Sequence, residues 1–189
     1  MRKNFLIAAV VTLIYACEKK QAKTVVIGNQ EWMTENLNVV TFRNGDPIPQ
    51  AATDEEWKNA SANKQPAWCY YNNDSANGEK YGKLYNWYAV NDPRGLAPQG
   101  WNIPNDTNWN TLKNYLDPSS INSDESLLAG GFLKETGTLN WLSPNEGAVN
   151  SSGFTARPGG LRVETGNFQF LNSNGLWWSS TQLDNLKAF

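Results

Sequence analysis

The apolar residues of this chain are unusually aromatic, and this feature constrains the fold more than any other. The sequence has nine Trp, seven Tyr and seven Phe in 189 residues, whereas Leu, Ile and Val are sparse beyond the first segment. Asn, Ser, Gly and Thr separate the aromatic side chains. This composition favours a loop-rich domain with an aromatic core over a helical bundle, and the length suits one domain.

Charge and the absence of histidine exclude several functions. A formal net charge of -2 provides no basic field, so we expect no nucleic-acid partner. Without histidine, the chain lacks the commonest general base and the commonest neutral metal ligand. Neither Cys69 nor any serine has an evident activating base, so we expect no catalytic residue, no enzyme and no cofactor. A hydrolase that uses two carboxylates stays open as an alternative.

The first 16 residues predict a secretory signal peptide. Arg2 and Lys3 precede an apolar run that is too short to cross a membrane, and the small residue Ala16 follows it. Position, flanking charge and length all favour export. A buried core helix is the alternative interpretation of the same residues.

The stretch IYAC at 14–17 resembles the lipobox of bacterial lipoproteins, with Tyr15 departing from the usual small or branched residue. The resemblance implies cleavage before Cys17 and lipid, such as palmitate, on its sulfur. Several acyl chains on one cysteine make a stable membrane anchor. Glu18, rather than Asp, implies the outer membrane of the cell envelope. Residues 17–23 then form the lipidated cysteine and a short polar tether.

Short strands are predicted where β-branched and aromatic residues stand between turn residues. Residues 25–33 predict a hairpin that turns at Gly28 and Asn29. The sequence WCYY at 68–71 predicts one buried strand, and GWNIP predicts a strand over 101–103.

Two segments predict loops rather than binding motifs. The polar stretch 72–80 lacks the spacing and the closing Glu of a calcium loop. PGG at 158–160 is too short for a phosphate-binding loop and predicts a tight turn. We therefore expect no metal site.

Helices are predicted from caps and from apolar spacing. Thr53 and Glu56 form a capping box for a helix over 54–60, and Asn105 caps a helix over 106–116. A third, short helix is predicted over 126–135. A helix over 82–91 is predicted by apolar residues at i, i+3, i+4 and i+7, namely Tyr81, Leu84, Tyr85 and Tyr88.

Three sequence blocks together resemble a known family: YGKLYNWYAV, LAPQGWNIPNDTNWNTLKNYL, and the stretch from LKETGTLNW to NGLWWSST. They are similar to the Fibrobacter succinogenes major paralogous domain of lipoproteins and secreted proteins, which also occurs in Bacteroidota. The domain is expected over residues 24–189. The resemblance implies an α+β fold that is C-type-lectin-like, with two main helices on a small twisted antiparallel sheet and long loops.

The resemblance also has implications for the C-terminus and for Cys69. Family members usually continue past WWSST through further strands, so the domain is expected to be incomplete, with open strand edges and exposed apolar faces. Some members have a cysteine where this chain has Ala97, and another near their end. Cys69 therefore has no evident partner, and we expect a buried free thiol.

For function, the resemblance implies binding rather than a reaction. Relatives with this fold bind sugars or proteins, and one branch contains an oxidase that makes formylglycine. We expect a lipid-anchored, non-catalytic binding module for glycan or surface protein. The alternatives are a structural or adhesin-like protein without a small ligand, and an enzyme of the formylglycine-forming type, which would need a second thiol.

The adjacent Trp177 and Trp178 are the strongest candidates for ligand contact. On a strand they would point to opposite faces, so that one is free to stack on a sugar ring. The alternative is that strands or loops cover both. Arg157 and Arg162 either add a contact or brace the loops. Because side-chain amides beside an aromatic ring suit sugar hydroxyls, the candidate ligand-binding residues are Asn172, Asn174 and Trp178.

Overall fold

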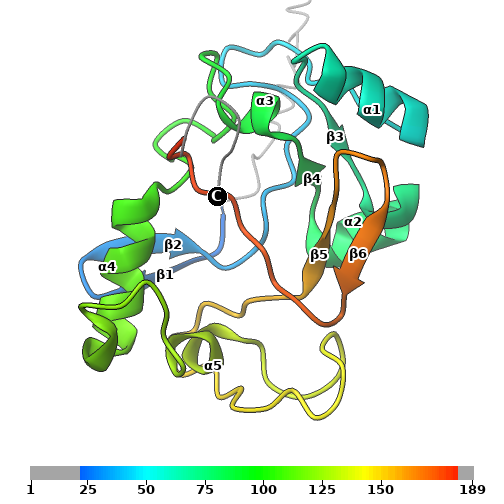
Figure 1. Ribbon diagram of the computed structural model, residues 1–189. Helices are drawn as coiled ribbons and strands as arrows, with labels where there is room; N and C mark the ends of the chain where they lie inside the picture. Colours follow the sequence, from blue (N-terminus) through cyan, green and yellow to red (C-terminus); the bar gives the residue numbers. More distant parts are fainter. Residues whose placement is uncertain (1–21, 183–189) are drawn as a thin grey trace, which may run out of the picture.

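The protein was analysed as a computed structural model, which describes residues 22–182 (Figure 1). The predicted signal peptide and Cys17 lie outside the described residues. The described part mixes α-helices and short antiparallel strands, which confirms the α+β class. Its first elements are β1 (Thr24–Ile27), β2 (Gln30–Met33), α1 (Asp54–Ala62), β3 (Trp68–Cys69), η1 (Tyr71–Asn73) and α2 (Ser75–Tyr81). Its later elements are β4 (Leu84–Tyr85), α3 (Trp87–Val90), α4 (Asp106–Leu116), η2 (Pro118–Ser120), α5 (Ala129–Leu133), β5 (Gly159–Arg162) and β6 (Phe168–Leu171).

The predicted N-terminal hairpin is confirmed as β1 and β2. Val25 pairs with Trp32, and Ile27 pairs with Gln30 across the turn. Gly28 has φ of 62°, a left-handed conformation that glycine adopts without a steric penalty. Period-two alternation then places Ile27 and Trp32 in the core.

The two capped helices are also confirmed. Thr53 Oγ1 accepts a hydrogen bond from the Glu56 N–H, and Glu56 Oε2 accepts one from the Thr53 N–H. At α4, the Asn105 side chain accepts a bond from the Asn108 N–H, and Asn108 Oδ1 accepts one from the Asn105 N–H. Each cap satisfies backbone donors that a helix start leaves unpaired.

The single helix predicted over 82–91 is wrong. Helix α2 ends at Tyr81, and Gly82 has φ of 73°, which ends helical geometry. A Cβ at Gly82 would lie 2.8 Å from the Leu37 carbonyl oxygen, so that a close backbone contact requires glycine here. The chain then forms β4, and Asn86 caps α3 by accepting a bond from the Ala89 N–H.

Other boundaries also differ from the predictions. The stretch predicted as a loop over 72–80 contains α2, because the Asp74 side chain caps it by accepting a bond from the Ala76 N–H. Residues 101–103 form no strand, and PGG leads into β5 rather than a tight turn. The WCYY strand is limited to Trp68–Cys69, and the third helix, α5, is shorter than predicted.

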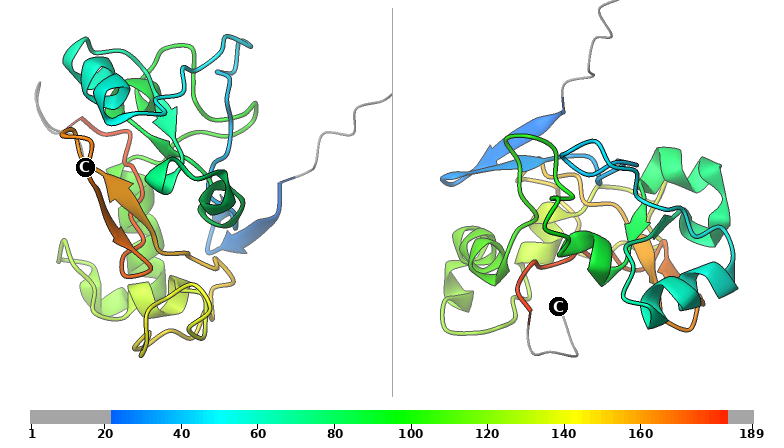
Figure 2. Two further views of the ribbon diagram at one scale, coloured as in Figure 1. Left: turned by 90° about the vertical axis from the view of Figure 1, so that its right-hand side faces the viewer. Right: turned by 90° about the horizontal axis from the view of Figure 1, so that it is seen from above.

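The strands form three separate two-stranded antiparallel sheets in residues 22–182, where one small sheet was expected. They are β1–β2, β3–β4 and β5–β6. Figure 2 shows the β1–β2 hairpin and the β5–β6 hairpin well apart in both views. The core is divided in the same way, because buried side chains gather in three clusters.

Each cluster is named here after a helix that contributes to it or packs against it. The α3 cluster contains Phe42, Ile48, Trp68, Tyr85, Ala89, Val90 and Leu96. The α4 cluster contains Ile27, Trp32, Leu112, Phe154 and Ala156. The α1 cluster contains Ala51, Trp57, Ala67 and Cys69.

Candidate ligand-binding cleft

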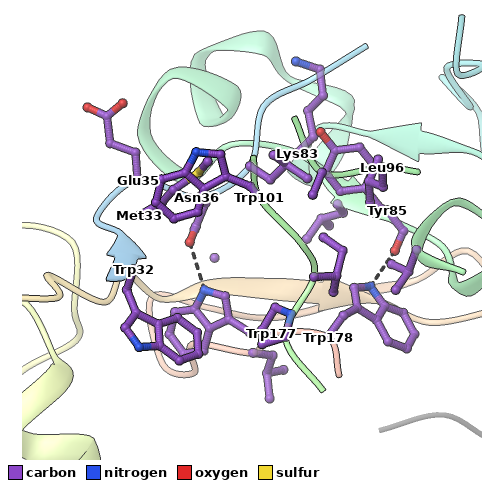
Figure 3. A pocket seen from close by; sticks show the side chains of 18 of the residues that line it. Trp32, Met33, Glu35, Asn36, Lys83, Tyr85, Leu96, Trp101, Trp177 and Trp178 are labelled. Atoms are coloured by element: carbon purple, nitrogen blue, oxygen red, sulfur yellow. Dashed lines mark hydrogen bonds between the residues drawn. The ribbon is translucent and has the colours of Figure 1, made fainter. Parts of the chain in front are cut away.

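A cleft of about 520 Å³ lies where the three clusters meet (Figure 3). We call it the central cleft. Tyr85 of the α3 cluster, Trp32 of the α4 cluster and Trp57 of the α1 cluster all line it. Its aromatic lining residues are Trp32, Trp57, Tyr81, Tyr85, Trp101, Trp109, Phe154, Trp177 and Trp178. Its polar and charged lining residues are Gln30, Glu31, Glu35, Asn36, Lys83, Asn102, Asn108, Arg157 and Arg162.

Trp177 and Trp178 lie outside any strand, yet their side chains point apart. The Trp177 ring lies 6.5 Å from the Trp109 ring and 6.0 Å from the Phe154 ring, centroid to centroid. The Trp178 ring lies 5.9 Å from Trp87 and packs against the α3 cluster. Both side chains border the cleft, from opposite clusters.

Hydrogen bonds fix the orientation of both indoles, as Figure 3 shows. Trp177 Nε1 donates to Asn36 Oδ1 at 2.9 Å, and Asn36 Nδ2 donates to the Tyr81 carbonyl at 2.9 Å. Trp178 Nε1 donates to the Tyr85 carbonyl at 2.8 Å. Trp177 is 36% exposed, whereas Trp178 is half-buried. Trp177 is thus the more accessible of the two.

One charged side chain at the cleft is held by aromatic rings. Lys83 Nζ lies 4.7 Å from the Trp68 ring centroid and 5.0 Å from the Tyr70 ring centroid. It also donates to the carbonyl and side-chain oxygens of Asn38. Burial lowers the pKa of Lys83 below its ordinary value. Asn38, Trp68 and Tyr70 do not line the cleft, so the ammonium group is directed away from it.

The structure does not bring the three candidate residues together. Trp178 lines the cleft, but Asn172 and Asn174 are not among its lining residues. Asn172 Nδ2 instead donates to the Tyr81 hydroxyl and the Asn140 carbonyl, which ties loops together. The carbonyl of Asn174 accepts a bond from the Gly160 N–H.

Sequence reasoning missed other residues that line the cleft together with Trp177 and Trp178. Trp32 and Asn36 come from β2 and the segment after it, and Trp101 comes from the loop before α4. Within β2, the alternation of inward and outward side chains could have indicated that Trp32 points into the core. Asn36 and Trp101 carry no local pattern, because only the tertiary fold places them at the cleft.

A family model described as the Fibrobacter succinogenes major domain matches residues 25–189 of the chain. The chain belongs to this family. The resemblance inferred from the three sequence blocks is therefore confirmed. Comparisons with curated proteins and with solved structures gave no match.

Arg162 is a buried arginine of this Fibrobacter succinogenes major domain, and its side chain holds loops together. Its side chain donates to the carbonyls of Gly166 and Ala51 and forms an ion pair with Asp54 at 2.6 Å. The guanidinium lies 4.5 Å from the Phe168 ring centroid. Arg157 likewise forms an ion pair, with Glu135 at 3.3 Å. Both arginines border the cleft while holding other segments in place.

Cys69 of the domain is a free, fully buried thiol, as expected. Burial raises the pKa of the Cys69 thiol to about 11, although a hydrogen bond from Arg162 opposes the shift. At neutral pH the side chain is therefore protonated, and a thiol is a far weaker nucleophile than a thiolate.

Within residues 22–182, Cys, Asp and Glu side chains form no group of three or more that could hold a metal ion. None of the helices in the same range has both the length and the apolar character needed to cross a bilayer.

Proposed function

We propose that this chain is a non-catalytic binding module of the bacterial cell envelope that binds a protein segment in the central cleft. The proposal includes lipid on Cys17, attachment to the outer membrane, and a C-type-lectin-like fold. The signal-like first segment and the IYAC sequence support the anchor. A long helix, α4, packed on an antiparallel hairpin, together with long connecting loops, supports the fold.

The central cleft is the observation that carries this proposal. Its volume of about 520 Å³ lies within the range of roughly 300–1,000 Å³ that is usual for ligand sites. Most of its lining side chains are aromatic or aliphatic, and nine are polar or charged. Apolar walls of this extent favour a ligand that itself carries apolar side chains, and a protein segment meets this requirement better than a polyhydroxylated glycan.

A binding role without catalysis agrees with the chemistry of the cleft. The thiol of Cys69 is buried and protonated at neutral pH. The chain has no histidine to activate a serine or a thiol. The cleft instead offers aromatic surfaces, amides, carboxylates and cationic groups, which are groups that recognise a ligand.

Tryptophan fluorescence of the purified full chain tests the proposal, because six of the cleft residues are tryptophans that report binding: Trp32, Trp57, Trp101, Trp109, Trp177 and Trp178. Apolar peptides are titrated against the wild type and against Ala97→Leu, which places a larger side chain at a residue that lines the cleft. We expect a saturable emission change and a raised melting temperature with a peptide, and weaker binding by the variant. If no peptide and no glycan changes either signal, the chain is a structural or adhesin-like protein and the proposal fails.

A glycan is the second candidate ligand, favoured by one specific contact. Trp177 is the exposed tryptophan at the cleft, and the Asn36 amide lies beside its indole at hydrogen-bond distance. The exposed aromatic face can pack on a sugar ring, and Asn36 Oδ1, which has a second lone pair beside its bond to Trp177, can accept from a hydroxyl. Titration with a panel of bacterial and plant glycans, followed by Trp177→Ala for any that binds, separates this ligand from a peptide.

The anchor is tested separately from the ligand. Cells that express the wild-type chain are fed labelled palmitate, and Cys17→Ala is the matched variant. We expect label in the wild type and none in the variant, which should also leave the membrane fraction. Label that persists in Cys17→Ala would place the lipid elsewhere.

A further inference from the structure

Strand β2 borders the central cleft along its whole length. All of its residues, Gln30–Met33, line the cleft, whereas no residue of its partner strand β1 does. The cleft therefore lies beside the edge of β2 that faces away from β1. The β1–β2 sheet has only two strands in residues 22–182, so no strand of its own sheet covers this edge.

Hydrogen bonds between the two strands show how the backbone of β2 is oriented. The Thr34 N–H donates to the Lys23 carbonyl, which makes Lys23 and Thr34 a hydrogen-bonded pair directly beyond the strands. Hydrogen-bonded and non-hydrogen-bonded pairs alternate along an antiparallel ladder. Val25 and Trp32, which pair two residues further along, are therefore bonded as well, and the backbone groups of Trp32 are directed towards β1.

The backbone groups of Glu31 and Met33 point the other way. Both residues lie next to Trp32 in β2, so the same alternation directs their N–H and C=O groups away from β1. No hydrogen bond to any of these four groups occurs within residues 22–182. A strand edge with unpaired groups of this kind can accept an added strand, whose main-chain bonds then contribute to its affinity.

Aromatic side chains lie beside this unpaired edge. The Trp32 ring is buried, and its centroid lies 4.9 Å from that of Trp109 and 5.9 Å from that of Phe154. All three residues line the cleft. Water can bond to the four backbone groups, but it leaves the apolar lining uncovered. An extended segment with an apolar residue opposite Trp32 would pair with the backbone and cover the lining at the same time.

The charge at this edge specifies a second position of such a segment. Glu31 is exposed, and its side chain points to the face of the sheet opposite to that of Trp32. Its cross-strand neighbour on β1 is Val26, and its carboxylate forms no ion pair within the part of the chain that the structure describes. A basic residue directly opposite Glu31 on an added strand would form a favourable cross-strand pair.

We propose that the partner's bound segment is an extended strand that pairs antiparallel with the edge of β2 and makes the β1–β2 hairpin a three-stranded sheet. This inference rests on the proposed function and specifies how the ligand binds. One residue of the segment bonds to both backbone groups of Glu31, and the residue two positions away bonds to both groups of Met33. The first of these residues is basic, and the residue between them, opposite Trp32, is apolar.

The capped heptapeptide TVTVKVT is designed for this register. With its lysine opposite Glu31, the valine before the lysine lies opposite Trp32, and the threonine before that valine lies opposite Met33. N-methyl groups on the lysine and on this threonine remove the two donors that face β2. N-methyl groups on the two valines that flank the lysine remove donors that face away from β2, so the second methylated peptide is the matched control.

Titrations followed by tryptophan fluorescence compare the three peptides on the full chain. We expect TVTVKVT to bind. The peptide that lacks the donors facing β2 should bind roughly tenfold or more weakly, because it cannot complete the strand ladder. The control peptide should stay within about threefold of the parent peptide, because its ladder to β2 is intact.

Hydrogen exchange provides a readout that a ligand lying elsewhere in the cleft would not produce. Binding of TVTVKVT is expected to slow exchange at the amides of Glu31 and Met33, which have no partner in the described part of the free chain. The amides of Gln30 and Trp32 already bond to β1, so their exchange should change less.

A charge reversal tests the register. Glu31→Lys should weaken TVTVKVT by about three- to tenfold and should strengthen binding of TVTVEVT, in which a glutamate replaces the lysine. Glu79→Lys is the control, because Glu79 is exposed on α2 and does not line the cleft, and it should leave the binding of both peptides unchanged. Equal weakening of both peptides by Glu31→Lys would contradict the proposed pairing.

The outcomes separate this inference from the function on which it rests. Peptide binding that leaves exchange at Glu31 and Met33 unaltered, or that both methylation patterns weaken equally, overturns strand pairing but leaves a peptide-binding cleft. Binding of other apolar peptides without binding of TVTVKVT has the same consequence. Binding of a glycan alone, or of no ligand, overturns strand pairing together with the proposal that the cleft binds a protein segment.

Discussion

The indole N–H of Trp178 donates a 2.8 Å hydrogen bond to the backbone carbonyl of Tyr85, which joins the C-terminal segment to β4. The neighbouring Trp177 bonds instead to a side-chain oxygen at a more exposed position. The two adjacent tryptophans therefore differ in what they contribute to stability.

Replacing each tryptophan by phenylalanine should show this difference. Trp178→Phe removes the bond to a strand carbonyl and packing against Trp87, so we expect a loss of about 2 kcal/mol in the free energy of unfolding. Trp177→Phe should cost about 1 kcal/mol or less, because solvent can replace its bond. Urea denaturation of the two variants measures both values. Equal losses would contradict the assigned difference in burial.

Arg162 is expected to be one of the most sensitive positions in the protein. Arg162→Ala removes bonds to two carbonyls and the packing against Phe168, so we expect a loss of about 2–4 kcal/mol in unfolding free energy. Asp54→Asn is the matched control, because the Asp54 side chain is mostly exposed. Thermal and urea melts of both variants test this. A similar loss for Asp54→Asn would show that the ion pair, rather than the carbonyl bonds, is dominant.

Cys69 should be unreactive in the folded protein and should limit stability at high pH. Its folded pKa of about 11 is raised, so the unfolded thiol ionises first. The contribution of this pKa difference to the free energy of unfolding is therefore fully present below about pH 8.5. It is lost as the pH rises towards 11. Mass spectrometry of the Cys69 peptide after treatment with a thiol reagent should show slow labelling that urea accelerates.

Cys69→Ala tests the pH dependence directly. The decline in melting temperature above pH 9 should become shallower in this variant. It should not vanish, because burial also raises the pKa of Tyr85 well above its usual range. Rapid labelling of native Cys69 would contradict its complete burial.

Arg94 should contribute to the loss of folding stability at acidic pH. Its guanidinium bonds to Asp92, which lowers the pKa of that carboxyl, and it contributes with Asn44 to lowering the pKa of Asp46. Lowered carboxyl pKa values stabilise the fold above about pH 4, and this contribution is lost as the pH falls further. Arg94→Gln should reduce stability at neutral pH and flatten the decline between about pH 4 and pH 2. Lys23→Gln, which breaks a largely exposed pair with Glu35, should leave the acid profile unchanged.

Local chemistry explains which elements could be predicted from the sequence. The caps at Thr53 and Asn105 satisfy backbone groups within their own helices, so α1 and α4 follow from a few adjacent residues. The β1–β2 hairpin likewise depends on Gly28 and on alternation. The segment after Tyr81 was mispredicted because its path depends on Leu37, which crowds Gly82 from a distant part of the chain.

The cleft was only partly predictable for the same reason. Trp178 could be selected because it adjoins another tryptophan. Asn36 lies 141 residues before Trp177, to which it bonds, and no sequence spacing indicates that contact. Asn172 was a reasonable candidate by its chemistry, but its amide is used within the fold.

The division of the core into three clusters around the central cleft affects how the molecule fluctuates. The α4 cluster is built on the β1–β2 hairpin, whereas the α3 and α1 clusters share the β3–β4 sheet, so the α4 cluster is expected to open separately from the other two. A ligand in the cleft touches all three. Its binding would therefore turn two separate opening events into one concerted event, and the entropy lost in doing so would lower its affinity.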